Sequence, residues 1–197
     1  ALEGIDYIIH LAAIVGEPAC QKDPALCSSI NLGGTEMINR LRSPNQKMVF
    51  ASTGGVYGRV DGICTENSPL NPIVSHYSIS KREAEKLIVD KGDYVIYRFA
   101  TGFGLSPRTK LDLLINDFVW QALKNKKLTV YQKDAKRSFI HVRDIAQGFV
   151  LAVENFQNIK NEVYNVGSEK LNISKEEIAK KIKEKVFYTL EKGKFKE

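Results

Sequence analysis

Cysteine is scarce in this chain of 197 residues, and the few that occur form no recognisable pattern. Cys20, Cys27 and Cys64 are odd in number, include no Cys-x-x-Cys pair and have no histidine at the spacing of a zinc site. A disulfide scaffold and a zinc finger are therefore excluded, and no metal site is expected. Spacing alone favours three unpaired thiols in a reducing compartment, and hence a cytoplasmic protein.

Long apolar runs are also missing. A membrane-spanning helix needs roughly 20 consecutive apolar residues, and the stretch from Ile8 to Val15 is short and interrupted by His10. No positively charged segment precedes an apolar run with a cleavage site, so nothing indicates secretion. The sequence has no repeats and no low-complexity segments. We expect no membrane partner.

Positive charge is in excess but is not concentrated as nucleic-acid binding requires. Lys plus Arg number 29 and Asp plus Glu 23, a formal net charge of +6. Half of that excess lies in residues 175–197, where Lys and Glu interleave as on a solvated helix face. No RNA-binding signature accompanies it. We therefore expect no nucleic-acid partner.

Hydrophobic patterning indicates strands alternating with helices. Short buried strands are expected at 6–11, 47–52 and 94–99, with helices from about 31 to 41 and from Ser75 to Lys91. Beyond Gly104 we expect helices at 111–124, at 144–154 and after a capping box at Ser174, and strands at 128–131, 138–142 and 163–166. Alternation of this kind predicts a parallel α/β sheet.

The most informative side chains are Tyr77 and Lys81, which lie four apart and share one face of the expected helix. A neighbouring ammonium lowers the pKa of a phenol and makes it useful in proton transfer at neutral pH. Thr53 ends a buried strand, where open α/β sheets place their ligands. Taken alone, each has an ordinary alternative: accidental surface neighbours for the pair, and the start of a turn for Thr53.

Together these motifs resemble the extended short-chain dehydrogenases/reductases, specifically the NAD-dependent epimerase/dehydratase family that acts on nucleotide sugars. Seven segments match in family order: 10–13 (His-Leu-Ala-Ala), 31–35, 52–58, the pair Tyr77 and Lys81, 98–104, 137–144 and 164–167. The resemblance covers nearly the whole chain.

The fold that the resemblance implies is a Rossmann-like, doubly wound parallel sheet with a smaller carboxyl-terminal substrate lobe. It places the end of the cofactor domain and the catalytic residues in 1–103. The substrate lobe lies mainly in 104–197, with returning Rossmann elements around 138–154. The family's glycine-rich fingerprint is absent, so its first βαβ units, about sixty residues, are expected before Ala1. Residues 189–193 resemble the family's last helix.

The resemblance also implies roles for individual residues. Tyr77, Lys81 and Thr53 would be catalytic: Tyr77 exchanges a proton, Lys81 holds the nicotinamide ribose and lowers the pKa of the phenol, and Thr53 orients the reacting oxygen. Cofactor contacts would come from Leu11, Ala12, Ala13, Asn31, Ser52, Tyr77, Lys81 and Phe99. Substrate contacts would come from Thr53, Thr101 and Arg137, with Arg137 on the diphosphate.

Two departures from the family pattern bear on the reaction. Gly54 and Gly55 stand where sugar-nucleotide dehydratases carry Asp-Glu, which argues against dehydration; Thr101 replaces the family's Asn. We therefore expect a nucleotide-diphosphate-sugar epimerase, similar to the UDP-glucose 4-epimerases, using NAD with NADP left open. The alternatives are a 4-ketoreductase and a non-catalytic NAD(P)-binding relative. A homodimer through helices at about 31–43 and 76–91 is also expected.

Overall fold

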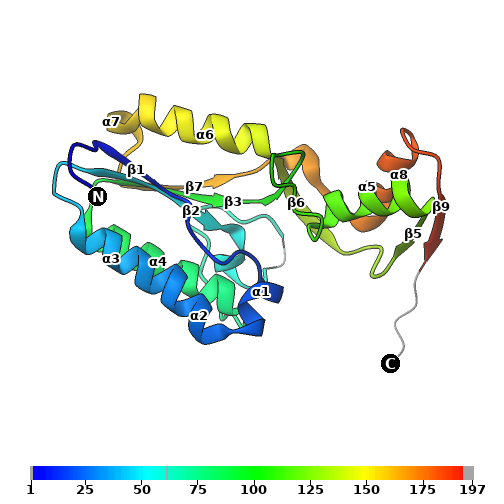
Figure 1. Ribbon diagram of the computed structural model, residues 1–197, viewed down its shortest axis with the longest axis horizontal. Coiled ribbons are helices and arrows are strands. Elements are labelled where there is room, and N and C mark those ends of the chain that lie inside the picture. The colour runs from blue at the N-terminus through cyan, green and yellow to red at the C-terminus, as the bar shows by residue number, and fades with distance from the viewer. Residues whose placement is uncertain (1, 61, 193–197) are drawn as a thin grey trace. The chain divides into compact units, whose positions relative to one another are not determined.

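A computed structural model describes residues 2–60 and 62–192 of the chain (Figure 1). These residues form two compact units, one made of Ala1–Phe99 and Gln147–Val166, the other of Ala100–Ala146 and Gly167–Glu197. The sequence-based division was 1–103 and 104–197 with returning elements around 138–154, whereas here the returning segment is Gln147–Val166. Gln147–Val166 joins the first unit because it carries a strand of that unit's sheet.

The first unit is built on a four-stranded sheet in which every neighbouring pair is parallel. Its order is β1-β2-β3-β7, with bounds Tyr7–His10, Lys47–Thr53, Tyr94–Phe99 and Glu162–Val166. Strands β2 and β3 are buried over most of their length, which is why they read as continuous apolar runs in the sequence. The expected parallel α/β architecture is confirmed.

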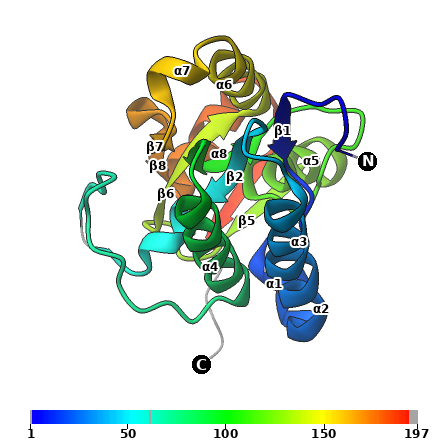
Figure 2. The same cartoon turned by 90° about the vertical axis from the view of Figure 1, so that its left-hand side faces the viewer.

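Helices cover both faces of this sheet. Helices α2, α3 and α4 lie against one face, and the part of α6 that belongs to this unit lies with α7 against the other (Figures 1 and 2). Their bounds, with α1 and a π-helical turn, are α1 Glu17–Lys22, α2 Pro24–Ser28, the turn Ser29–Gly33, α3 Gly34–Leu41, α4 His76–Lys91, α6 Val142–Glu154 and α7 Phe156–Ile159.

The expected ends of α4 are confirmed. Ser75 is its N-cap, and its Oγ accepts a hydrogen bond from the backbone N–H of Ser78 at 3.2 Å. Gly92 ends the helix at φ 76°, a conformation that glycine adopts without strain. Between these ends, Ala84 and Ile88 are fully buried in one apolar cluster with Phe50 of β2. The helix is thereby held against the sheet.

The second unit has its own sheets and core. Strands β4, β6 and β8 (Thr101–Phe103, Lys136–His141 and Asn172–Ser174) form one sheet, and β5 (Lys127–Val130) pairs with β9 (Thr189–Lys192). Helices α5 (Leu114–Asn125) and α8 (Lys175–Lys183) contribute Phe118 and Ile178 to its core. The expected capping box is present between Ser174 and Glu177.

The expected helix at 189–193 is wrong. Thr189–Lys192 forms strand β9, which runs parallel to β5, and Gly193 lies outside the described residues. The chain is set in place just before the strand by Tyr188, a buried side chain in the same core as Leu128. The backbone N–H of Thr189 then donates to the carbonyl of Lys126 at 2.9 Å.

The expectation of three unpaired thiols is also wrong, because Cys20 and Cys27 form a disulfide. Helix α1 ends at Lys22, and the carboxylate of the next residue, Asp23, caps α2 by accepting from the backbone N–H of Leu26 at 2.9 Å. This reversal brings the two cysteine Cα atoms to 5.1 Å, within the range that a disulfide requires. Cys64 is a free cysteine. The argument for a reducing compartment from unpaired thiols therefore no longer holds.

No helix among residues 2–60 and 62–192 is long and apolar enough to cross a membrane. Within the same residues, no group of three or more His, Cys, Asp or Glu side chains is placed to hold a metal ion.

Candidate functional site at the carboxyl ends of β1, β2 and β3

Lys81 joins helix α4 to the carboxyl-terminal part of strand β2. Its Nζ donates a hydrogen bond to the carbonyl oxygen of Ala51 at 2.9 Å and lies 4.5 Å from the ring centre of Phe50. The side chain is only 2% exposed. Tyr77, one turn earlier on α4, is half-buried. The two residues therefore stand on the helix that covers the end of β2.

Thr53 begins the turn that follows β2. Its Oγ1 accepts a hydrogen bond from the backbone N–H of Gly55 at 3.2 Å, so the hydroxyl caps the 3₁₀ turn Gly54–Tyr57. This turn packs against the first turn of α4, because a Cβ atom added to Gly55 would collide with Ser78 Oγ. A side chain at position 55 would require the Ser78 hydroxyl to turn away. The close packing also brings the Thr53 turn to the part of α4 that carries Tyr77.

Burial shifts the pKa of Tyr77 in the direction opposite to the one expected from the sequence. It raises the pKa of Tyr77 to about 12, whereas Lys81 was expected to lower it. Desolvation also lowers the pKa of Lys81 to about 8, against the attraction of Glu85. The ammonium is directed at the Ala51 carbonyl, and burial dominates the phenol. Tyr77 therefore holds its proton at neutral pH in this arrangement.

A buried ion pair lies one turn beyond Lys81 on α4. Glu85 accepts hydrogen bonds from Arg98 Nη2 at 2.7 Å and from Arg98 Nε at 3.1 and 3.2 Å. Both residues are at least nine-tenths buried, and Ser52 Oγ also donates to Glu85. Arg98 Nη1 donates to Tyr57 Oη at 2.9 Å, and that hydroxyl donates to Asn165 Oδ1 at 2.8 Å. Within the described residues no buried side-chain N or O lacks a partner.

Sheet register explains why these groups meet. Ser52 of β2 is paired with Arg98 of β3, and Arg98 is paired with Asn165 of β7. Residues paired across neighbouring strands point to the same face of a sheet. Ser52, Arg98 and Asn165 therefore form a row across three strands whose side chains point toward α4. There Glu85 accepts hydrogen bonds from Ser52 and Arg98.

The residues expected to line a cofactor after β1 occupy an open loop. Leu11 and Ala12 are exposed and Ala13 is half-buried. Asn31 is 1% exposed and holds the next part of the loop, since its Oδ1 accepts from the backbone N–H of Ile14 at 2.7 Å and its Nδ2 donates to the Ile14 carbonyl at 3.0 Å. Asn31 thus fixes the loop backbone at Ile14, and the exposed Leu11 and Ala12 lie just before it in the chain.

Two further expected cofactor residues have protein partners. The hydroxyl of Ser52 donates to Glu85, and its side chain is buried. Phe99 is half-buried and makes ring contacts with Tyr97 at 5.6 Å and with Phe149 at 5.4 Å between centroids. Both residues stand at the carboxyl end of their strands, where the sequence placed them.

Thr101 and Arg137 belong to the second unit, on β4 and β6. Thr101 is half-buried and is paired in register with Phe139. Arg137 is exposed, is paired with Ile173 of β8, and its guanidinium has no hydrogen-bond or ion-pair partner among the residues described. Its donors are available to an anion.

The residues present fit the nicotinamide end of a dinucleotide. The buried Lys81 ammonium has three N–H donors, and within the described part of the chain one of them meets an acceptor, the Ala51 carbonyl. The remaining donors suit hydroxyl groups such as those of a ribose. The exposed loop at Leu11 and Ala12 and the half-buried phenol of Tyr77 are the other groups of this site that a dinucleotide could contact.

Comparison with known families bears on the origin of this arrangement. The family model "NAD dependent epimerase/dehydratase family" matches residues 1–167. The chain belongs to this family. Its members are NAD-dependent enzymes that share the Rossmann-like α/β fold seen in the first unit.

Individual relatives agree with this assignment. The chain is 34% identical over 176 residues to YtcB of Bacillus subtilis (strain 168), described as an uncharacterised UDP-glucose epimerase, covering 84% of this chain and 54% of that protein. It is 27% identical over 170 residues to GDP-6-deoxy-D-talose 4-dehydrogenase of Aggregatibacter actinomycetemcomitans, covering 82% and 55%. The chain thus spans about half the length of these relatives.

A solved structure is similar over nearly the whole chain. UDP-glucuronic acid 4-epimerase from Bacillus cereus, in complex with UDP-glucuronic acid and NAD, is 29% identical with a TM-score of 0.81. The match covers 98% of this chain and 64% of that one.

Two residues of the site were not found from the sequence. Glu85 continues the four-residue spacing of Tyr77 and Lys81, and that spacing was a usable signal for one helix face. Glu17 accepts hydrogen bonds from Ser75 and from the backbone of Tyr77, some 60 residues along the chain. Nothing in the local sequence around Glu17 indicates that contact.

We expect Glu85→Gln to destabilise the protein strongly. The amide keeps the shape of the carboxylate but leaves the buried Arg98 guanidinium without its counter-charge, and breaking a buried pair in this way costs about 3–5 kcal/mol. The measurement is the free energy of unfolding in urea. The control is Glu83→Gln on the same helix, whose pair with Lys86 is partly exposed, with an expected change below about 0.5 kcal/mol. Equal effects of the two substitutions would contradict the role given to the buried pair.

Proposed function

We propose that this chain is part of an NAD-dependent epimerase of a nucleotide-diphosphate sugar. The observation that carries the proposal is the placement of Tyr77 and Lys81 on α4 beside the turn that begins at Thr53. The similarity to YtcB and to the UDP-glucuronic acid 4-epimerase supports the substrate class. A cytoplasmic location, expected from the sequence, belongs to the same proposal.

In this proposal the three side chains have distinct roles. Tyr77, protonated at neutral pH because burial raises its pKa, exchanges a proton with the sugar hydroxyl at the reacting carbon. Lys81 binds the ribose next to the nicotinamide through the donors that Ala51 leaves unused. Thr53 orients the reacting oxygen. Bound NAD would supply the hydride-transfer chemistry at that carbon.

Cofactor contacts in the proposal come from both the loop and the sheet. Leu11, Ala12 and Ala13 contribute the open surface after β1, and Phe99 an apolar wall. Asn31 and Ser52 act through the backbone that they fix, because their polar side-chain atoms already have partners within the protein. NAD is preferred to NADP because the family is described as NAD-dependent.

Tyr77→Phe tests the central claim. The substitution removes only the phenolic hydroxyl, so in the full-length enzyme we expect turnover to fall by roughly 10²- to 10⁴-fold, the usual contribution of a positioned proton-transfer group. The control is Tyr94→Phe, which removes a hydroxyl bonded to the Asn161 carbonyl at the opposite end of β3. Turnover of Tyr77→Phe within a few-fold of wild type would exclude Tyr77 from the mechanism.

A 4-ketoreductase is the second candidate, because a dehydrogenase acting at the 4-position is among the relatives. The two activities differ in cofactor balance. An epimerase regenerates its cofactor in every cycle, whereas a ketoreductase consumes one reduced cofactor for each product. Absorbance of the reduced nicotinamide during turnover separates them. A protein that binds the cofactor but turns over no nucleotide sugar would be the non-catalytic relative.

On the substrate side we propose that Arg137 binds the diphosphate and that Thr101 and Thr53 contact the sugar. In the proposal the bound diphosphate covers the exposed Arg137 guanidinium and shields the pair from water, so Arg137→Ala should raise KM by about 30-fold or more. Titration calorimetry with a nucleoside diphosphate measures the loss directly. The control is Lys133→Ala, a lysine of the same basic run whose ammonium lies 3.6 Å from Asp134. Equal affinities of wild type and Arg137→Ala would place the diphosphate elsewhere.

We further propose a homodimer through the outer faces of α3 and α4, which lie side by side in Figure 2. Met37, Leu41 and Ile79 are exposed apolar side chains on these helices, at 51%, 62% and 39%. Burying them against a second copy removes apolar surface from water. Sedimentation velocity at micromolar concentration should show a dimer, and Leu41→Glu should dissociate it. A monomeric wild-type protein would refute this interface.

A further inference from the structure

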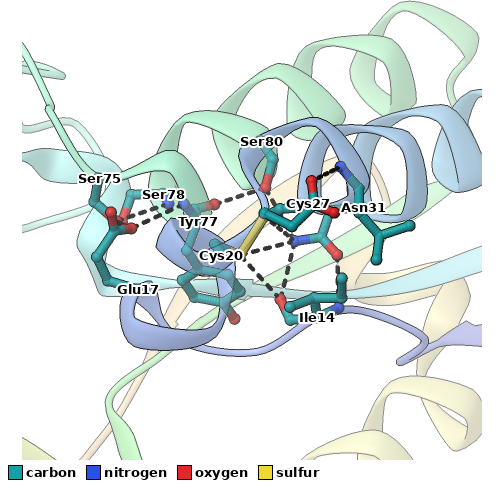
Figure 3. The surroundings of a disulfide bond; sticks show 11 residues. Ile14, Glu17, Cys20, Cys27, Asn31, Ser75, Tyr77, Ser78 and Ser80 are labelled. Atoms are coloured by element: carbon teal, nitrogen blue, oxygen red, sulfur yellow. Dashed lines mark hydrogen bonds between the residues drawn. A yellow bond between two sulfur atoms is a disulfide. The ribbon is translucent and has the colours of Figure 1, made fainter.

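Glu17 lies in the first turn of α1, but its carboxylate is directed at another helix. Its Oε2 accepts hydrogen bonds from Ser75 Oγ at 2.5 Å and from the backbone N–H of Tyr77 at 3.1 Å (Figure 3). Ser75 is the N-cap of α4, and Tyr77 is its second residue. The first N–H groups of a helix have no partner within the helix. Glu17 supplies that partner at the residue proposed to transfer the proton.

The charge of Glu17 suits this position. Burial raises the pKa of Glu17, but hydrogen bonds from Ser75 and from the backbone of the next two residues outweigh burial, so the pKa is lowered overall. The side chain is therefore an anion at neutral pH. A negative charge at the N-terminus of a helix is stabilised by the aligned peptide dipoles.

The carbonyl of Tyr77 is held from the other side. Ser80 Oγ donates to it at 2.8 Å, and Asn31 Nδ2 donates to Ser80 Oγ at 3.1 Å. The backbone N–H of Tyr77 is thus bound by Glu17, and its carbonyl by Ser80, whose hydroxyl is in turn held by Asn31. Figure 3 shows Glu17 on one side of the Tyr77 backbone, and Ser80 with Asn31 on the other.

The disulfide anchors the segment that carries Glu17. Cys20 lies one turn after Glu17 on α1, and its bond to Cys27 joins α1 to α2, which leads into the turn that contains Asn31. Both cysteines are fully buried, and Asn31 Nδ2 lies 3.4 Å from Cys27 Sγ. One covalent link therefore fixes the two residues, Glu17 and Asn31, that reach toward Tyr77.

We propose that Glu17 is a positioning residue for Tyr77 and that the Cys20–Cys27 disulfide holds Glu17 in place. The inference rests on the proposed function, in which Tyr77 is the proton-transfer residue. Small displacements of a catalytic group cost large factors in rate, so the effect belongs to turnover rather than to substrate binding.

The redox step that would release the anchor is an exchange with a dithiol. A thiolate of the dithiol attacks one sulfur, the Cys20–Cys27 bond breaks, and the second dithiol sulfur closes the reagent into its own disulfide. Two electrons and two protons pass to the protein, which then carries two thiols. After reduction, the Cys20 thiol can donate a hydrogen bond to the Ile14 carbonyl, which lies 3.5 Å from its Sγ. The disulfide sulfur has no hydrogen and cannot make this bond.

The first experiment substitutes Glu17 in the full-length enzyme with NAD present. Glu17→Ala should lower kcat about 10- to 100-fold with KM changed less than threefold, and it should accelerate hydrogen exchange of the Tyr77 amide. Glu17→Gln, which keeps an acceptor oxygen, should recover part of the loss. The matched control is Asp23→Ala, which removes a carboxylate cap from α2 without touching α4; its kcat should equal that of wild type.

Outcomes of this experiment separate the two levels of the proposal. An inactive Tyr77→Phe beside a fully active Glu17→Ala would overturn the positioning role and leave the proposed function intact. A fully active Tyr77→Phe would overturn both. Equal losses in Glu17→Ala and Asp23→Ala would also overturn the positioning role, because general loosening of the α1–α2 segment would then explain the loss.

The second experiment tests the anchor with dithiothreitol. Alkylation in denaturant without reductant, followed by peptide mass spectrometry, should label Cys64 and leave Cys20 and Cys27 unlabelled; all three should be labelled after reduction. Reduction should lower kcat of wild type in the same direction as Glu17→Ala and add little in that variant, because the two changes act through one contact. Labelling of all three cysteines without reductant, or independent and additive losses, would overturn the anchoring role.

Discussion

The position of helix α4 on its sheet depends on one buried ion pair. Glu85 and Arg98 cannot be separated without leaving a charge in the protein interior, and that penalty is far larger than the net gain from making the pair. Because Arg98 stands in a fixed row with Ser52 and Asn165, the pair also fixes which turn of α4 faces the carboxyl ends of the strands. Lys81 lies one turn earlier and so reaches Ala51. The pair therefore constrains the register of α4 on the sheet, while the apolar cluster of Ala84, Ile88 and Phe50 holds the helix against it.

Burial then shapes the chemistry that this register brings together. It pushes the pKa of Tyr77 up and that of Lys81 down, which favours the neutral form of both groups. His10, at the end of β1, follows the same rule: desolvation, with a smaller contribution from Lys81, lowers its pKa to about 4, and its Nε2 lies 2.9 Å from Thr35 Oγ1. At neutral pH Tyr77 is therefore a protonated phenol and His10 a neutral imidazole, whereas Lys81, with a pKa of about 8, remains mostly an ammonium.

The turn after β2 limits which reaction such a site performs. Gly55 lies so close to Ser78 that a Cβ atom there would meet the Ser78 hydroxyl, and this closeness brings the Thr53 turn to the first turn of α4. Neither Gly54 nor Gly55 carries an acid–base group, in agreement with a reaction that needs one proton-transfer residue.

Local patterns in the sequence determined most of the framework. Ser75 and Gly92 marked the ends of α4, apolar runs marked β2 and β3, and the spacing of Tyr77 and Lys81 placed both on one face, because caps, strand burial and helix periodicity are properties of neighbouring residues. Only the tertiary structure decided the pairing of Cys20 with Cys27, the contact of Glu17 with α4, the strand at Thr189–Lys192 and the raised pKa of Tyr77. Each of these depends on which distant groups share a buried space, and burial and long-range pairing are set by the packed fold rather than by adjacent residues.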